Sequence, residues 1–261
     1  MRTSGTVLTA DGTRLAYQLD GAGPPLLLLA GQANHHGWWD QVRPDFAAFR
    51  TITLDWRGTG DSEEGAVDFT TRTLAGDVDD VLDAVGFTTV DVYGTSMGGR
   101  VAQRLAVDHP ERVSRLVLGC TTPGGEQAVE RSQEVRRRLA VADRDAVREA
   151  LADLMYTPAW RAAHPGPHVT LGDPAISAVS ARRHLRASAR HDAYDALPAI
   201  GCPTLVLHGS DDDFAPVVNA RLIAERIPGA TLRLFDGARH AYFEECRPES
   251  SLVVRNFLTA G

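Results

Sequence analysis

The sequence has few cysteines, no long apolar run and a shortage of positive charge, and each shortage excludes a class of protein. Its three cysteines, Cys120, Cys202 and Cys246, are scattered and odd in number. They argue against a disulfide scaffold, and no two have the spacing of zinc ligands. No apolar run approaches the length of a membrane span, and residues 1–5 contain no apolar signal core. These absences predict a reduced, cytoplasmic protein.

The charge balance argues against two classes of binding partner. The formal net charge is -7, whereas nucleic acids and anionic membranes are bound by basic faces. We therefore expect a small-molecule partner and neither of these polyanions. The length of 261 residues and a hydrophobic content of 43% are typical of one globular domain with an insertion. Whether copies of the chain assemble into a homo-oligomer is left open by the sequence.

Strand and helix patterns alternate along most of the chain, which predicts a mainly parallel sheet covered on both faces. The pattern begins with a hairpin around Asp11-Gly12. Buried strands are expected at 26–29, 51–54, 88–93, 113–119, 204–207 and 231–235. Helices are expected at 73–85, 103–108, 218–227 and 250–258. The alternation stops from about 127 to 191, where an arginine-rich segment with helical stretches such as 130–155 predicts a helical insertion over the sheet.

The central pattern is the turn Gly94-Thr95-Ser96-Met97-Gly98 between a strand and a helix. A strand that turns at once into a helix forces the central residue into a strained conformation, and the two glycines remove Cβ atoms that would clash. The turn presents the Ser96 hydroxyl at its tip, above the N-terminus of the helix. The backbone N–H of Met97 is then available to an oxyanion. A glycine-rich turn with an incidental serine is the alternative.

A serine nucleophile needs a base and a group that orients the base. Open α/β sheets carry such groups on loops at the carboxyl ends of strands. Two loops qualify, one from His208 to Pro216 with three adjacent aspartates, and one from Asp236 to His240. The order serine, aspartate, histidine is the one found in α/β-hydrolases.

With these pieces, the chain resembles the α/β-hydrolase superfamily over nearly its whole length. It is most similar to the branch of capped esterases, enol-lactonases and cofactor-free haloperoxidases. The resemblance implies an α/β-hydrolase fold with a mainly parallel eight-stranded sheet. Residues 1–123 and 196–261 would form the core, and 124–195 a helical cap. The matching segments are the loop 26–31, Asp55-x-Arg57-Gly58-x-Gly60-x-Ser62, the Ser96 turn, His208-Gly209-x-x-Asp212-x-x-x-Pro216 and Gly237-x-x-His240.

The resemblance also implies the roles of the site residues. Ser96 would be the nucleophile, His240 the base and Asp212 the orienting acid, with Asp212 favoured over its two aspartate neighbours by the register of the turn. The oxyanion hole would be formed by the backbone N–H groups of Gln32 and Met97. No cofactor is implied. The adjacent aspartates are not expected to bind a metal, because no second group of ligands lies near them in the sequence.

Two departures from the family pattern bear on the site. Ala30-Gly31 stands where many relatives have His-Gly, which alters the surroundings of the Gln32 amide but keeps its N–H. Arg239 stands where relatives often have glycine, directly before His240. Its cation would either lower the pKa of the imidazole or reach a substrate anion, and the sequence does not distinguish the two.

Substrate choice is expected to depend on the insertion and the first loop. Arg182, Arg186 and Arg190 share one helical face, which is either solvated or an anion site. The Asp55 to Ser62 turn is expected to shape the sheet edge without chemistry. Candidate pocket walls, for which core packing is the alternative, are Trp38, Trp39, Met155, Tyr156, Trp160 and Phe214.

The predicted function is hydrolysis of a small or medium carboxylic ester or lactone through an acyl-enzyme on Ser96. One alternative is another reaction of the same triad, namely perhydrolysis of the haloperoxidase type, thioester hydrolysis or carbon–carbon bond hydrolysis. A second alternative, of another class, is a non-catalytic ligand-binding protein on a hydrolase scaffold. A serine at the turn, in place of an aspartate, argues against haloalkane or epoxide opening.

Overall fold

The structure is a computed structural model that describes residues 2–260, apart from the side chain of Arg144. One eight-stranded sheet organises it, with the strand order β1-β2-β4-β3-β5-β6-β7-β8. The strands are β1 (Thr3–Leu8), β2 (Arg14–Asp20), β3 (Pro25–Leu29), β4 (Arg50–Leu54), β5 (Val90–Thr95), β6 (Val113–Gly119), β7 (Thr204–Gly209) and β8 (Thr231–Phe235).

Pairing within the sheet is parallel from β4 to β8 and antiparallel where the hairpin joins it. β1 pairs with β2, and β2 with β4, in antiparallel register. The hairpin turn needs Gly12, whose φ of +81° favours glycine. β3 is buried from Leu26 to Leu29 because helices cover both faces of the sheet. The predicted mainly parallel, eight-stranded α/β-hydrolase fold is confirmed.

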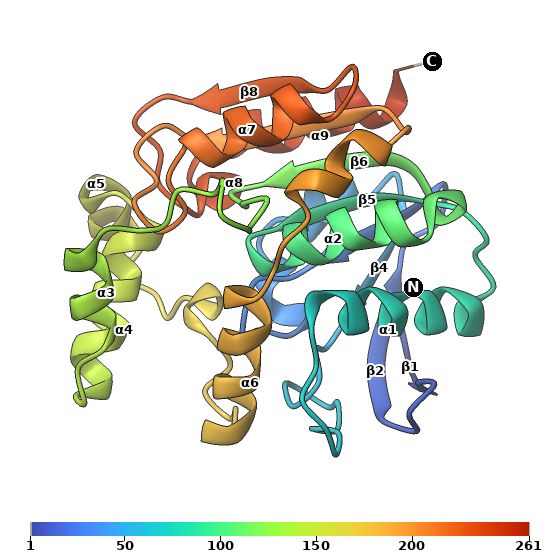
Figure 1. Cartoon of the computed structure of the whole chain (residues 1–261), viewed down its shortest axis with the longest axis horizontal. Helices are drawn as coiled ribbons and strands as arrows, with labels where there is room; N and C mark the ends of the chain where they lie inside the picture. Colours follow the sequence, from blue (N-terminus) through green and yellow to red (C-terminus); the bar gives the residue numbers. More distant parts are fainter. Residues whose placement is uncertain (1, 261) are drawn as a thin grey trace.

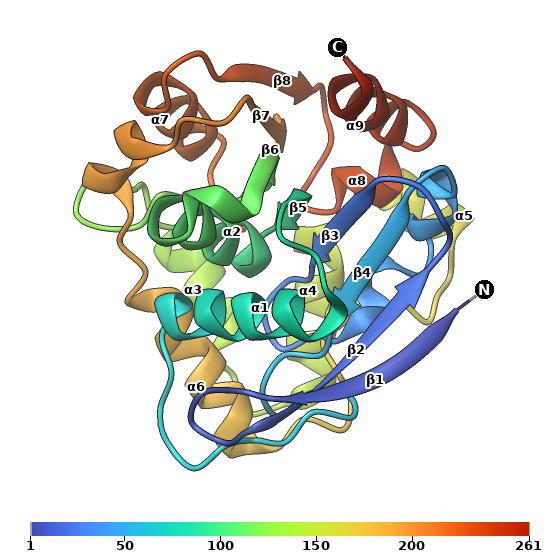
Figure 2. The same cartoon turned by 90° about the vertical axis from the view of Figure 1, so that its right-hand side faces the viewer.

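Helices form a layer on each face of the sheet, as Figure 2 shows. One layer consists of α1 (Thr71–Val85), α2 (Met97–Asp108) and α7 (Val218–Arg226). The other contains α8 (Tyr242–Glu245), α9 (Glu249–Thr259) and the 3-10 helix η2 (Arg43–Phe46), against which α9 packs. A second short helix, η1 (His36–Trp39), follows β3. The four-residue helices were not predicted, because they are too short to show a periodic pattern.

Local sequence explains where α1 begins and ends. The Thr70 hydroxyl accepts a hydrogen bond from the Thr73 N–H, and the Thr73 side chain accepts one from the Thr70 N–H. This reciprocal cap adds two residues to the helix predicted at 73–85. Gly86 ends the helix in the left-handed conformation, with φ of +76°.

The insertion between β6 and β7 is helical and lies at the end of the sheet toward which β8 points (Figure 1). Its helical stretch within 130–155 is broken into two helices, because Ser132 and Asp143 each cap a new N-terminus. The division into core and cap stays a prediction. The elements of the insertion are α3 (Gln133–Leu139), α4 (Arg144–Met155), α5 (Pro158–Ala163), η4 (Val169–Leu171), α6 (Ala178–Ala189) and η5 (Tyr194–Ala199).

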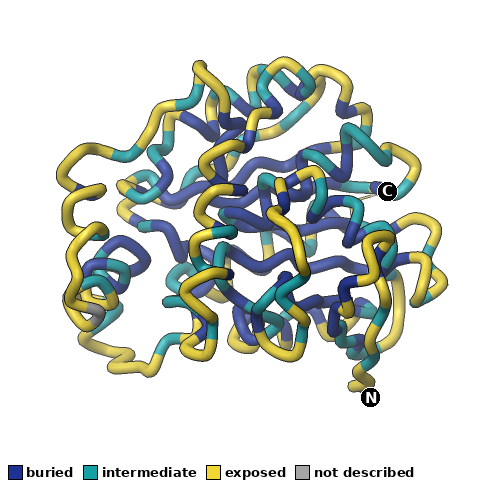
Figure 3. The backbone as a smooth tube through the Cα atoms, turned by 60° about the horizontal axis from the view of Figure 1, so that its bottom comes forward, coloured by how far each residue is buried: buried dark blue, intermediate teal, exposed yellow. Residues whose placement is uncertain are grey.

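The two ends of the insertion meet at one place. Gly124 and Asp192 form an antiparallel bridge, and the Ala193 N–H donates to the Pro123 carbonyl at 2.8 Å. In Figure 3 the strands form a buried centre, while the outer turns of the insertion are exposed. None of the helices among the described residues has both the length and the apolar character to cross a membrane.

Candidate active site

Ser96 lies at the junction of β5 and α2 in a strained backbone conformation, with φ of 54° and ψ of -119°. A Cβ at Gly98 would lie 2.1 Å from the Leu29 carbonyl oxygen, and one at Gly94 would lie 2.4 Å from the Gly98 carbonyl oxygen. Only glycine fits either position, because backbone atoms fill the space. The Ser96 N–H donates to the Gly119 carbonyl at 2.9 Å, which anchors the turn to β6.

The two predicted oxyanion donors lie at the ends of neighbouring strands. Gln32 follows β3, and Met97 is the first residue of α2 after β5, while β3 and β5 pair in parallel up to Leu29 and Gly94. As the first residue of the helix, Met97 has no acceptor for its N–H within α2. The helix N-terminus also favours negative charge. This placement is what an oxyanion hole requires, and the role of the two amides stays a prediction.

Asp212 and His240 are joined directly. The Nδ1 atom of His240 lies 2.7 Å from Oδ2 of Asp212. The other carboxylate oxygen, Oδ1, accepts hydrogen bonds from the N–H groups of Phe214 and Ala215 at 2.9 and 2.8 Å. Because the carboxylate can only accept, Nδ1 carries a proton, and in the neutral ring Nε2 therefore carries the lone pair.

His208 contributes a contact that sequence reasoning missed. Its Nε2 lies 3.1 Å from Oδ2 of Asp212 and 2.7 Å from the Ala215 carbonyl oxygen. From the sequence, His208 is expected only to pack or to form a hydrogen bond at the end of its strand. The available signal was its position four residues before the acid, within the same turn.

The neighbouring histidines keep the Asp212 carboxyl group ionised. Burial raises the pKa of this carboxyl, but the attraction of His240 and the hydrogen bonds from His208 and His240 outweigh it, so the pKa lies well below its usual range. The carboxylate is therefore ionised at neutral pH and able to stabilise an imidazolium.

His240 presents an unpaired ring nitrogen. Its side chain is 1% exposed, and Nε2 has no hydrogen-bond partner among the described residues. The Phe214 ring stands edge-on to the imidazole, with centroids 4.8 Å apart. No hydrogen bond joins His240 to Ser96 in the described part of the chain. The three predicted triad residues follow the parallel strands β5, β7 and β8, so they lie on the side of the sheet where the carboxyl ends of these strands point.

Arg239 forms hydrogen bonds with the backbone of the helical insertion. Its guanidinium donates hydrogen bonds to the carbonyl oxygens of Asp153 and Tyr156 at the end of α4. The next residues continue the attachment, since the Ala241 N–H donates to the Met155 carbonyl at 2.8 Å. Arg239 thus fastens the loop of His240 to the insertion.

Four of the six predicted pocket residues belong to the hydrophobic core. Trp38, Trp39, Met155 and Tyr156 are each at most 3% exposed and pack in the main cluster. The Trp38 indole donates to Thr95 Oγ1 at 2.9 Å, so it supports the strand that carries Ser96. The structure therefore favours the core-packing alternative for these four.

A cavity of about 490 Å³ lies between α2, α3, α4 and α6, and Phe214 is the predicted pocket residue that lines it. Its other apolar walls include Leu139, Leu151 and Leu185. Gln32 also lines it, so the cavity adjoins the predicted oxyanion hole. None of the triad residues lines it, and its apolar walls make it a candidate space for an acyl or alkyl chain.

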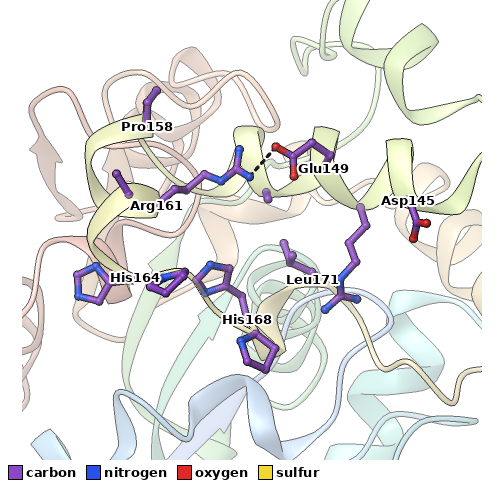
Figure 4. Close-up of a pocket in the computed structure, with 12 residues that line it drawn as sticks. Asp145, Glu149, Pro158, Arg161, His164, His168 and Leu171 are labelled. Atoms are coloured by element: carbon purple, nitrogen blue, oxygen red, sulfur yellow. Dashed lines mark hydrogen bonds and ion pairs between the residues drawn. The ribbon is translucent and has the colours of Figure 1, made fainter.

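A second cavity, of about 550 Å³, is separate from the candidate triad. Figure 4 shows its lining by α4, α5 and the segment through His164 and His168, with the ion pair of Arg161 and Glu149. None of the triad residues lines it. Trp160 lines an adjoining cavity with His164 and His168 and stacks on Tyr156, with centroids 4.2 Å apart.

Two further groups of polar side chains, on α6 and after β3, form local contacts. Arg182, Arg186 and Arg190 are exposed on α6 and its end, and Arg186 pairs with Asp68 at 3.1 Å, which favours the solvated face. His35, His36 and Asp55 lie close enough to hold a metal ion. Their atoms are engaged in hydrogen bonds instead, including His36 Nδ1 to Asp55 Oδ1 at 2.7 Å.

Known proteins resemble this chain in sequence and in fold. A model of the alpha/beta hydrolase fold family matches residues 24–150. The 2-hydroxymuconate semialdehyde hydrolase of Pseudomonas sp. strain CF600 is 33% identical, over 97% of this chain and 93% of its own. A solved hydrolase from Pseudomonas aeruginosa PA01 is 28% identical, with a TM-score of 0.84 and 99% of each chain covered. Est816, described as an N-acyl homoserine lactone degrading enzyme, is 27% identical, with a TM-score of 0.84 and coverage of 97% of this chain and 100% of its own.

These matches agree with the geometry at the strand ends. The strained serine turn follows β5 in the parallel part of the sheet, and the joined aspartate and histidine come after it in the order that the family requires. The chain belongs to the alpha/beta hydrolase fold family.

Proposed function

We propose that this protein hydrolyses a small or medium carboxylic ester or lactone through an acyl-enzyme on Ser96. The observation that carries the proposal is the pairing of His240 Nδ1 with Asp212, which leaves a buried Nε2 with a free lone pair. His240 and Ser96 both follow the carboxyl ends of parallel strands, β8 and β5, in the same sheet. A base with this tautomer is what a serine hydroxyl needs to become a nucleophile at neutral pH.

The proposed reaction has two halves. His240 takes the proton of the Ser96 hydroxyl as its oxygen attacks the substrate carbonyl, and the N–H groups of Gln32 and Met97 receive the charge that forms on the carbonyl oxygen. His240 then gives the proton to the leaving alcohol or enol. A water molecule repeats the sequence on the acyl-enzyme, which releases the acid and restores Ser96. Asp212 stabilises the imidazolium in both halves.

The test is labelling and turnover in matched serine variants. The native protein is expected to hydrolyse p-nitrophenyl esters and to react with a fluorophosphonate probe, whereas Ser96→Ala loses both, with kcat lower by about 10⁴-fold or more. Ser4→Ala removes an exposed hydroxyl from β1 and serves as the control, which should retain both activities. Labelling that persists in Ser96→Ala would refute Ser96 as the nucleophile.

A second candidate is carbon–carbon bond hydrolysis by the same triad. It is favoured by the 33% identity to the 2-hydroxymuconate semialdehyde hydrolase. The two candidates separate in a direct comparison of kcat/KM for 2-hydroxymuconate semialdehyde and for a panel of esters, lactones and thioesters of graded size. A higher value for the semialdehyde supports carbon–carbon cleavage, and a higher value for esters or lactones supports the leading proposal.

A further inference from the structure

The cavity beside the candidate active site carries an excess of positive charge. Three arginines and one glutamate line it, namely Arg100, Arg131, Arg136 and Glu130. Glu130 pairs with Arg136 at 3.3 Å, and both side chains are exposed at the rim. The charges of Arg100 and Arg131 are left over. In a chain with a net charge of -7, two such cations in one cavity create a local field that attracts anions.

Arg131 lacks the partners that a partly buried guanidinium normally has. Its guanidinium forms no hydrogen bond or ion pair with any described residue, although Glu130 and Asp212 attract it from farther away. Its guanidinium lies over the Phe214 ring, 4.1 Å from the centroid. The same ring stands edge-on to His240. Phe214 therefore connects the unpaired cation to the catalytic base, with one ring between them.

Arg100 is only partly satisfied. One terminal nitrogen donates to the Ser188 carbonyl at 2.6 Å, at the end of α6, but the buried Nε has no hydrogen-bond partner among the described residues. Arg100 lies four residues after Ser96 on α2, about 6 Å along the helix axis. The Arg100 N–H donates to the Ser96 carbonyl at 3.3 Å, so Arg100 lies one helical turn from Ser96. Burial, with Arg131 nearby, lowers the pKa of Arg100 to about 10, which keeps it charged at neutral pH.

From these contacts we infer that Arg100 and Arg131 bind an ionised carboxylate at the far end of the substrate. The substrate would be an ester or lactone with an aliphatic chain along Leu139, Leu151 and Leu185, its carbonyl at Ser96 and its carboxylate between the two guanidinium groups. Carboxylates match the planar donor fork of arginine. The inference rests on the proposed ester hydrolysis and adds the class of substrate.

The experiment compares charged and neutral substrates of the same length. The mono-p-nitrophenyl esters of the dicarboxylic acids from succinate to suberate carry a free carboxylate. In the matched methyl p-nitrophenyl diesters, a methyl ester replaces that carboxylate. The native protein is expected to show a higher kcat/KM for at least one hemiester than for its diester, at low ionic strength. In Arg131→Gln the ratio of the two values should fall about ten-fold or more, since a hydrogen bond to a charged group is lost. Raising the salt concentration should reduce the ratio in the native protein.

The control is Arg137→Gln, which removes the same charge from an exposed position on α3 that does not line the cavity. It should keep the native ratio. Arg100→Lys retains a cation and a donor toward Ser188, so comparing it with Arg100→Gln separates anion binding from the support of α6. A native protein that prefers the neutral diester at every length, or an Arg131→Gln variant that keeps the native ratio, overturns the inference.

A binding measurement distinguishes this inference from the proposed function. In Ser96→Ala, the free dicarboxylates from succinate to suberate should raise the melting temperature, and addition of Arg131→Gln should abolish the rise. Esterase activity without any such stabilisation or hemiester preference refutes the anion site alone. Stabilisation in a protein that hydrolyses no ester refutes the proposed hydrolysis and supports the anion site.

Discussion

Glu244 on α8 is a buried carboxyl group with one oxygen bonded and one unpaired. The Tyr156 hydroxyl donates to Oε2, while Oε1 has no partner among the described residues. Burial raises the pKa of Glu244 to about 7, above the ordinary value of 4.5, although the bond from Tyr156 opposes the shift. The folded state therefore holds this proton more tightly than the unfolded state does.

The sign of the pH effect follows from that difference. As the pH rises from about 4.5 to 7, the unfolded chain loses the proton first, so the free energy of unfolding falls. The total fall in the free energy of unfolding from Glu244 is about 3 kcal/mol. We expect Glu244→Gln to remove this fall, so that the variant gains stability over the native protein between pH 5 and pH 8. Urea unfolding followed by tryptophan fluorescence at both pH values measures it.

Glu249→Gln is the control for Glu244, because Glu249 is exposed on α9. Its stability should follow the native pH dependence. If Glu244→Gln instead loses stability with pH as steeply as the native protein, the burial of Glu244 does not control this part of the pH profile.

At the scale of elements, Arg57 holds three of them together. It follows β4 and pairs with Asp77 on α1 and with Asp11 in the β1–β2 turn, at 2.6 Å in each case. The side chains of Arg57 and Asp77 are 2% and 3% exposed. The segment after β4 is thus tied to the β1–β2 turn and to α1 by ion pairs of one buried arginine.

Removal of this cation should be far more costly than removal of a surface cation. Arg57→Gln leaves the Asp77 carboxylate buried without its partner, and we expect a loss of about 3 to 5 kcal/mol in the free energy of unfolding. Arg72→Gln breaks the pair with Asp108, in which the arginine is 66% exposed, and should cost less than about 1 kcal/mol. Urea unfolding of both variants at pH 7 gives the comparison, and equal losses would contradict it.

At the scale of the whole molecule, contacts at its ends and along α4 couple the helical insertion to the sheet. Its ends meet at Gly124 and Asp192, so one short connection could replace it. One set of its contacts with the site runs through the end of α4, where carbonyl groups accept hydrogen bonds from Arg239 and from the backbone of Ala241. The insertion therefore both covers the cavity and holds the loop that carries His240.

Replacement of residues 126–190 by a short Gly-Ser linker tests both roles. We expect the far-UV circular dichroism of the sheet to persist, while turnover of neutral esters falls because the loop of His240 loses its anchor. The ratio of kcat/KM for hemiester over diester should fall several-fold, since Arg131 and most of the cavity wall are removed. A shortened chain that kept the native ratio would show that the insertion does not form the substrate pocket.

The sequence predicted the features that depend on short-range patterns. Short apolar segments between helical segments marked the strands. A strand that is buried on both faces of the sheet is a continuous apolar run, such as Leu26 to Leu29. Gly94 and Gly98 marked the serine turn, because backbone atoms approach each too closely for a side chain. The resemblance to α/β-hydrolases implied Asp212 and His240 as partners, and their side chains lie 2.7 Å apart.

The tertiary structure decided what lies between segments that are distant in the chain. It turned Arg239 toward the carbonyls of α4, set His208 on the carboxylate of Asp212, and placed Trp38 in the core under the serine turn. It also brought Arg100 and Arg131 into one cavity. A charged or aromatic side chain looks the same in the sequence whether it is solvated, packed or facing a ligand. Its role is set by the groups that folding places within a few ångströms of it, and periodicity carries no information about them.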